Sequence, residues 1–163
     1  MTAPAPVQQE DIVAAATKFL LTKTDLVAAV GSTNNKPWIT GYTLVRKVFE
    51  GSMSTAVVIS SENGWAGPNL HNTLRFPLLM VSVWGDPIRD QIHNYVNLPE
   101  VRRRVNAVYE LVDQYLHRPD GSDAMWSTIR TVSSARFTEP EIINVPDGDG
   151  MVLLRVFYAV TQG

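Results

Sequence analysis

Three histidines and a few neighbouring carboxylates are the residues whose types could support metal or acid–base chemistry. Asp90 and His93 are three positions apart, and on a helix this spacing places two potential metal ligands on one face. A third ligand would have to be His71 or Asp86, and no motif brings either of them close. We therefore favour exposed polar side chains, and a metal-dependent hydrolase using His71, Asp90 and His93 is kept as an alternative.

Other catalytic patterns are missing or incomplete. The chain has no cysteine, which excludes disulfides, thiolate zinc sites and cysteine nucleophiles. It has no Gly-x-Ser-x-Gly elbow and no phosphate-binding loop ending in Lys-Ser or Lys-Thr. Asp147 and Asp149 match the first two acidic positions of a calcium loop, but its third acidic position and its distal Glu are missing. The sequence predicts no enzyme, no cofactor and no metal.

Charged residues suggest a contact with other protein. Arg102, Arg103 and Arg104 fall in the first turns of a predicted long helix and point away from its apolar stripe. Acidic residues gather in a different part of the chain: Glu139, Glu141, Asp147 and Asp149. Opposite charges on one molecule suit a head-to-tail interface, which closes into a ring when the rotation allows. A solvated helix face is the alternative.

Two aromatic segments are further candidates for contacts. Trp65 and Asn69 lie in a Gly- and Pro-rich loop, where an aromatic ring either anchors a partner or pins the loop to the body. Met80 and Trp84 lie on one face of a predicted strand, 76–84, whose other face is also apolar. Such a strand is covered twice, by its own helices or by a neighbour.

The elements that position these residues can be read from periodicity. Amphipathic spacing predicts a helix from residue 11 to 20, a short helix capped by Thr24, and a long helix from 99 to 117. His117 would end the long helix, where a cation complements the helix dipole. A helix beginning at Asp86-Pro87 and running to about residue 95 is as well supported as a loop.

Strands are predicted at 38–45, 56–60, 76–84, 126–138 and 151–161. Polar and glycine-rich stretches predict a turn at 32–36 and loops at 62–75 and 139–150. This order predicts an α+β fold, with a mainly antiparallel β-sheet and helices packed on one face. We expect a flexible lead at 1–10 and a single domain at 11–163.

Composition limits the function further. The chain has 163 residues, 14 basic and 16 acidic, for a net charge of −2, and only 18% of its residues are charged. That near-balance argues against a coat for nucleic acid or an anionic membrane. The N-terminal residues lack a secretion signal, and apolar stretches of about ten residues are too short for a bilayer span. We therefore expect a soluble protein used without export.

Short motifs along the chain resemble one protein family. They are Pro37-Trp38-Ile39, Ala56-Val57-Val58-Ile59-Ser60, Gly64-Trp65-Ala66-Gly67-Pro68-Asn69, His71-Asn72-Thr73, Arg75-Phe76-Pro77, Asp86-Pro87, Arg89-Asp90, Leu116-His117-Arg118-Pro119 and Val145-Pro146-Asp147-Gly148-Asp149-Gly150. Their order and spacing, over about residues 11–161, are similar to those of tail terminator (tail completion) proteins of long-tailed phages (siphoviruses), especially phages of actinobacterial hosts.

The resemblance implies a small α+β subunit of a homo-oligomeric ring, typically a hexamer, that caps the finished tail tube. Such a ring ends tube polymerisation and forms the surface for head–tail joining, without catalysis or cofactor. The implied partners are further copies of the chain, the tail tube protein, and a head–tail connector or head completion protein. Genome DNA would pass through the lumen without specific binding, and no membrane is involved. The implied location is the head–tail junction of the virion, after assembly in the host cytoplasm.

The family offers no interface signature that carries over residue by residue. The interface is therefore inferred from this sequence as Arg102, Arg103, Arg104, Trp65, Asn69, Met80, Trp84, Glu139, Glu141, Asp147 and Asp149. The remaining alternatives are a head-side connector or other virion adaptor, the metal-dependent hydrolase, and a monomeric module that binds a small ligand.

Overall fold

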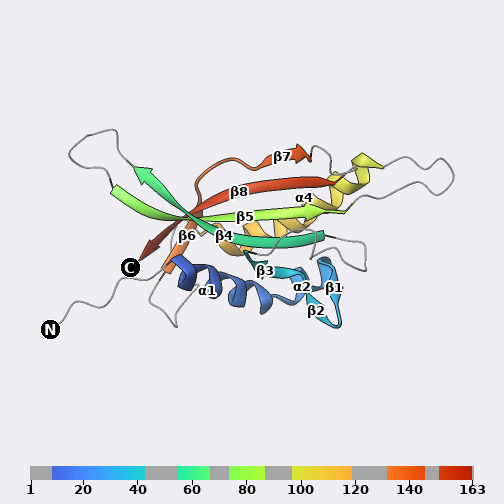
Figure 1. Ribbon diagram of the computed structural model, residues 1–163, viewed down its shortest axis with the longest axis horizontal. Coiled ribbons are helices and arrows are strands. Elements are labelled where there is room, and N and C mark those ends of the chain that lie inside the picture. The colour runs from blue at the N-terminus through green and yellow to red at the C-terminus, as the bar shows by residue number, and fades with distance from the viewer. Residues whose placement is uncertain are drawn as a thin grey trace.

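The computed structural model describes residues 9–42, 55–66, 74–86, 97–118, 132–145 and 151–162 (Figure 1). The helices and strands are α1 (Gln9–Leu21), α2 (Thr24–Ala29), β1 (Ser32–Thr33), β2 (Lys36–Pro37), β3 (Ile39–Gly41), β4 (Thr55–Ala66), β5 (Leu74–Gly85), α4 (Leu98–Leu116), β6 (Val132–Arg136), β7 (Glu141–Asn144) and β8 (Val152–Gln162). None of the helices in these ranges is long and apolar enough to cross a membrane.

One mixed sheet forms the centre of the molecule. Its strand order is β3-β4-β5-β8-β6. Both β6 and β7 pair with the same edge of β8, β6 near the end of that strand and β7 near its beginning. All pairings are antiparallel except that of β3 with β4, while β1 and β2 form a separate hairpin. The expected α+β fold with a mainly antiparallel sheet is confirmed.

The helices cover one face of this sheet. On α4, the expected stripe of buried residues is present: Val101, Val105, Val108, Val112 and Leu116. These side chains join those of α1, α2 and one face of β4, β5 and β8 in a single buried cluster. Asn97 caps α4 by accepting a hydrogen bond from the backbone N–H of Glu100 at 3.3 Å. The apolar periodicity of the sequence and the cap at Asn97 together account for the long helix and for where it begins.

The hairpin of β4 and β5 is longer than the sequence predicts. Each strand has 12 residues, and the pairing continues to Ala66 opposite Leu74. Residues 62–66 and 74–75, predicted as loop, are therefore strand. Cross-strand pairing overrides the turn preference of Asn63-Gly64, because every added pair contributes ladder hydrogen bonds.

Three smaller expectations can also be compared with the structure, which corrects the first and the third and confirms a turn within 32–36. Lys23, not Thr24, occupies the N-cap position of α2, and it makes no side-chain capping bond. The polar turn at 32–36 is a hairpin in which Asn34 and Asn35 have φ of 51° and 63°, as two-residue hairpin turns require. The segment predicted as loop at 139–150 contains β7, which pairs with β8 in an antiparallel hairpin.

The predicted strand at 38–45 is β3 alone within the described residues, since Tyr42 has a φ of 55° and leaves the extended conformation. The expected helix at 86–95 falls outside the described residues apart from Asp86, which is not helical. Residues 126–131 of the predicted strand at 126–138 also fall outside them.

Candidate interaction surfaces

The sheet face that points away from the helices is rich in apolar side chains, and we call it the outer sheet face. On β5, Leu79, Val81 and Val83 point toward the helices and are fully buried, whereas Met80 and Trp84 alternate with them and are half-buried. On the three central strands β4, β5 and β8, the described side chains of the outer sheet face are Ala56, Val58, Ser60, Leu78, Met80, Ser82, Trp84, Leu153, Arg155, Phe157 and Ala159.

Strand register brings the two predicted contact residues into one surface. Met80 lies between Ser60 of β4 and Phe157 of β8, and Trp84 lies opposite Leu153. These side chains form rows that run across the sheet, as directly opposed residues in antiparallel strands do. The structure therefore places Met80 and Trp84 on a shared, mostly apolar face.

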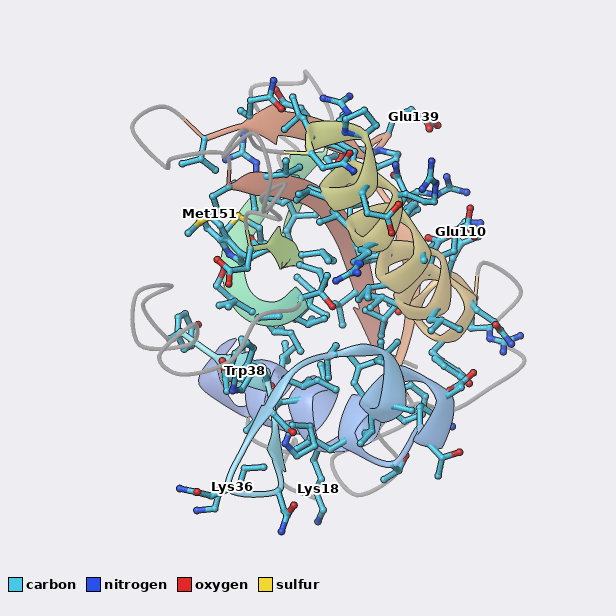
Figure 2. The ribbon with its side chains drawn as sticks, turned by 90° about the vertical axis from the view of Figure 1, so that its right-hand side faces the viewer. Lys18, Lys36, Trp38, Glu110, Glu139 and Met151 are labelled. Carbon is cyan, nitrogen blue, oxygen red and sulfur yellow. The ribbon has the colours of Figure 1, made fainter. Side chains whose placement is uncertain are left out.

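A tryptophan side chain packs on one end of this face. Trp38, which immediately precedes β3, is 5% exposed and packs with Ala56 in a cluster separate from the main core (Figure 2). Ala56 is in turn opposite Trp84 in the register. The tryptophan quoted in the sequence motif thus covers the outer sheet face beside one of the predicted contacts.

An ion pair lies at the edge of the outer sheet face. The guanidinium of Arg155 is 3.3 Å from the carboxylate of Glu141 and 5.9 Å from the ring centroid of Phe157. The side chains of Arg155 and Glu141 are 38% and 61% exposed. Both charges are therefore accessible to a partner, and a pair this exposed contributes about 1 kcal/mol or less to stability.

The three arginines at the start of α4 face away from the buried stripe, as expected, but they have partners within the chain. Arg103 and Arg104 both form ion pairs with Glu100, the latter at 3.5 Å. Arg102 donates a hydrogen bond to the side-chain oxygen of Asn144 at 3.4 Å. The sequence interpretation missed Glu100, although its spacing of three and four residues from Arg103 and Arg104 is the signal for such pairs.

One of these arginines reaches β7, the strand that begins with Glu141. The contact between Arg102 and Asn144 brings the start of α4 to the end of β7, the strand that begins with Glu141. Glu139 lies 3.8 Å from Arg136, and its own side chain is 91% exposed. Arg102 therefore lies beside the end of β7, whereas Glu139 pairs with Arg136 and Glu141 with Arg155.

Four predicted contacts cannot be placed on these surfaces. Asn69, Asp147 and Asp149 lie outside the described residues, and Trp65 is described only by its backbone. That backbone pairs Trp65 with Arg75, near the far end of the β4–β5 hairpin.

A polar network under α4 was not predicted. The hydroxyl of the fully buried Tyr158 donates a hydrogen bond to Asp113 at 2.8 Å, and the Arg136 guanidinium lies 3.6 Å from the same carboxylate. Burial raises the pKa of Tyr158 far above its ordinary value, and the charge of Asp113 raises it further. The tyrosine therefore stays protonated and acts as a donor that aligns β8 with α4.

The end of α4 is joined to β6 by hydrogen bonds. His117 is the C-cap residue, as expected, but its Nδ1 accepts a hydrogen bond from the backbone N–H of Arg136 at 2.9 Å. His117 therefore joins the end of α4 to the last residue of β6 through a ring nitrogen. Ser134 reinforces the joint by donating to the carbonyl of Leu116.

The residues of the metal alternative are mostly outside the described ranges. His71, Asp90 and His93 are not described, whereas Asp86 is half-buried and its pKa is raised by burial. Within the ranges that are described, no three His, Cys, Asp or Glu side chains are grouped so that they could hold a metal ion.

Comparisons with known proteins identify a shared fold. No protein-family model and no curated protein sequence matches the chain. Its structure is similar to that of a chain in the solved "Virion of native gene transfer agent (GTA) particle", with a TM-score of 0.57 and 16% sequence identity. The match covers 93% of this chain and 95% of the other. At this identity the likeness shows the fold.

Proposed function

We propose that this chain is a structural virion protein that forms a ring on the end of a completed tail tube, with six subunits as the family resemblance implies. The ring ends polymerisation of the tube and presents the surface to which the head attaches. In this role the chain is neither an enzyme nor a cofactor-binding protein. Its place is the head–tail junction of a phage-like particle.

The observation that carries the proposal is the nearly end-to-end fold likeness to a chain of a gene transfer agent virion, 93% of one chain against 95% of the other. A match over nearly the whole of both chains supports the same kind of structural unit. The ordered sequence motifs independently point to the same class of particle.

The one-sided fold supports a role in assembly. The helices bury one face of the sheet, while the outer sheet face keeps Met80, Trp84 and Phe157 half-buried. Apolar side chains on an otherwise polar surface are typical of a protein–protein contact. We assign Met80 and Trp84 to a contact with the neighbouring subunit or with the tube.

The remaining predicted residues are proposed as the rim of these contacts. Arg102, Arg103 and Arg104 at the start of α4 are assigned to partner binding, together with the acidic residues near and after β7: Glu139, Glu141, Asp147 and Asp149. Trp65, near the end of β4, and Asn69 are assigned to a further contact with a partner. Rim charges mainly set which partner binds and in which orientation.

A ring with two different faces can end the growth of the tail tube. An open tube end keeps adding subunits because it presents unsatisfied binding groups, as the edge of a sheet does. A ring that matches this end on one side satisfies those groups and offers a different surface on the other. The net charge of −2 suits a conduit for DNA, since a basic lumen would hold phosphates and slow their passage.

Deleting the gene for this chain from its phage tests the proposal. The expected result is particles with overlong tails that lack heads, because the tube is neither capped nor joined. Tail lengths are measured by electron microscopy, and the chain supplied in trans is the control that should restore normal length and joining.

The other outcomes separate the alternatives. Tails of normal length beside unattached, DNA-filled heads would replace the terminator with a head-side connector. Normal, infectious particles that do not contain the chain would refute a virion role altogether. Stoichiometric zinc or manganese in the purified protein would instead favour the hydrolase.

A further inference from the structure

Within the described residues, three large apolar side chains are prominently exposed. They are Leu21 at 40%, Tyr42 at 52% and Phe137 at 49%. Leu21 and Tyr42 border the same groove, whereas Phe137 belongs to the connection between β6 and β7. Leu21 and Tyr42 therefore form one shared apolar site, and the ring of Phe137 stands apart from it.

The groove lies between the flank of α1 and the end of β3 and has a volume of about 520 Å³. Its lining is mostly apolar and consists of Val13, Ala14, Thr17, Lys18, Leu21, Gly41 and Tyr42. The hydroxyl of Thr17 is already used, because it donates to the carbonyl of Val13 at 2.7 Å. An apolar group is therefore the occupant that the groove fits best, and Lys18 is the one charged residue among the described lining residues.

Phe137 is held in place by its own backbone. Its N–H donates to the carbonyl of Phe157 at 2.7 Å, and the hydroxyl of Thr138 accepts from the N–H of Phe157 at 3.3 Å. The exposed ring therefore projects from a fixed main chain. A preorganised aromatic group loses little conformational freedom when it enters a pocket.

The groove and the phenylalanine lie at opposite edges of the sheet. The groove adjoins β3, the first strand of the order β3-β4-β5-β8-β6, whereas Phe137 directly follows β6, the last. Figure 2 shows the same separation for two charged side chains, with Lys18 at the lower end and Glu139 at the upper end. The two features therefore cannot meet within one molecule.

The charges beside the two features are opposite. Lys18 is exposed in the lining of the groove, and Glu139, two residues after Phe137, has a side chain that is 91% exposed. Glu139 also lies 3.8 Å from Arg136 of its own chain, but its carboxylate is exposed enough to face a lysine of a second copy as well. Charge complementarity of this kind sets the register of a contact.

We infer that Phe137 of one copy occupies the groove between α1 and β3 of the next copy, with Glu139 facing Lys18. The contact joins two different surfaces, so it repeats from copy to copy and closes into a ring when the rotation allows. This inference rests on the proposed function and adds the residues that join the subunits. One buried phenylalanine is an anchor for a larger interface, to which the neighbouring charges add specificity.

Cross-linking tests this contact directly, because the chain has no cysteine of its own. The variant with both Lys18→Cys and Glu139→Cys replaces the charged pair but keeps Phe137 and the apolar lining of the groove. Particles carrying this variant are treated with a short bismaleimide and separated by denaturing electrophoresis. The expected result is a ladder of oligomers that ends at the ring number, whereas each single variant gives no species above a dimer.

Two controls show that the ladder reports this contact. Glu110, which is exposed on α4, replaces Glu139 in a matched pair, Lys18→Cys with Glu110→Cys, and this pair should give no ladder. Adding Phe137→Ser to the first pair should reduce the species above dimer by about tenfold or more, as loss of a central anchor does. Circular dichroism checks that the variant remains folded.

The outcomes distinguish this inference from the proposed function. If the double variant is present in particles with normal tails but gives no ladder, the contact is wrong and the capping function stands. An unchanged ladder after Phe137→Ser would also overturn the contact. If the unsubstituted chain is absent from particles, the proposed function is wrong, and the inferred contact is wrong with it.

Discussion

Gly85 leaves the space that two valines of α4 occupy. A Cβ atom at this position would lie 2.5 Å from Cγ2 of Val105 and 2.9 Å from Cγ1 of Val101. Both valines are fully buried, so neither can turn away freely. We expect Gly85→Ala to lower the free energy of unfolding by about 1–3 kcal/mol, measured by urea denaturation.

A double-mutant cycle identifies the cause of that loss. Val105→Ala removes the atom closest to the added methyl group and lowers stability by itself through the cavity that it leaves. If the clash is the cause, combining it with Gly85→Ala should destabilise the protein by less than the sum of the two single effects. If the two losses of stability simply add, Gly85→Ala destabilises the backbone of β5 and not the contact with α4.

The pair formed by Asp25 and Tyr115 makes stability depend on pH. The Tyr115 hydroxyl is 2.6 Å from the Asp25 carboxylate, and this hydrogen bond is the main reason that the pKa of Asp25 is lowered. A lowered carboxyl pKa stabilises the fold above the ordinary value, near pH 4, and that stabilisation is lost as the pH falls through the folded value. Tyr115→Phe should therefore destabilise the protein at pH 6 and have a much smaller effect near pH 2, as measured by urea denaturation.

The Tyr115→Phe variant removes the hydroxyl and keeps the aromatic ring. It keeps the ring that contacts Phe19 edge-on at 6.5 Å between centroids and over which the Lys23 ammonium lies at 5.0 Å. The packing of α1 and α2 against α4 is thus preserved while the hydroxyl is removed. A stability difference that is equal at both pH values would show that the hydrogen bond to Asp25 is not responsible.

Individual side-chain roles were predictable where the partner is close in the chain. The outward direction of Arg103 and Arg104 follows from the helical period, and so does their pairing with Glu100. The bond between Tyr158 and Asp113 joins residues 45 positions apart. It exists because β8 lies under α4, and no local pattern specifies that arrangement.

At the scale of elements, the start of α4 depends on its cap. Asn97 accepts the N–H of Glu100, one of the backbone donors that a helix start leaves without a helical partner. Asn97→Ala should lower the free energy of unfolding by about 1 kcal/mol, measured by urea denaturation. Asn97→Asp is the control that keeps an acceptor and should retain most of the stability, whereas equal losses in both variants would contradict a capping role.

The sequence predicts an element well when its signal is long. The stripe of α4 repeats over 19 residues, and its one-sided pattern has a single interpretation. The four residues of β7 are too few for a period to emerge, and they exist as a strand because β8 offers an edge beside them. In the same way β4 continues through Asn63-Gly64 because β5 pairs with it.

At the scale of the whole molecule, charge and composition predicted a protein that meets other proteins without saying where. The half-buried residues Met80 and Trp84 were found from the alternation of one strand, and the structure places both on the outer sheet face. The groove beside α1 was not predicted. It is formed where Gly41 of β3 meets Val13 of α1, an approach that depends on a parallel pairing three residues long.

The position of β8 has a consequence for how the chain reaches its fold. β8 is the last described strand along the chain, yet it lies inside the sheet and pairs Leu78 with Ala159 and Gly85 with Val152. Such pairings between distant residues close large loops before any contact energy is gained, which slows folding. During synthesis, β5 therefore waits with an open edge until residues 152–162 have left the ribosome, and this interval is when the nascent chain most needs protection from aggregation.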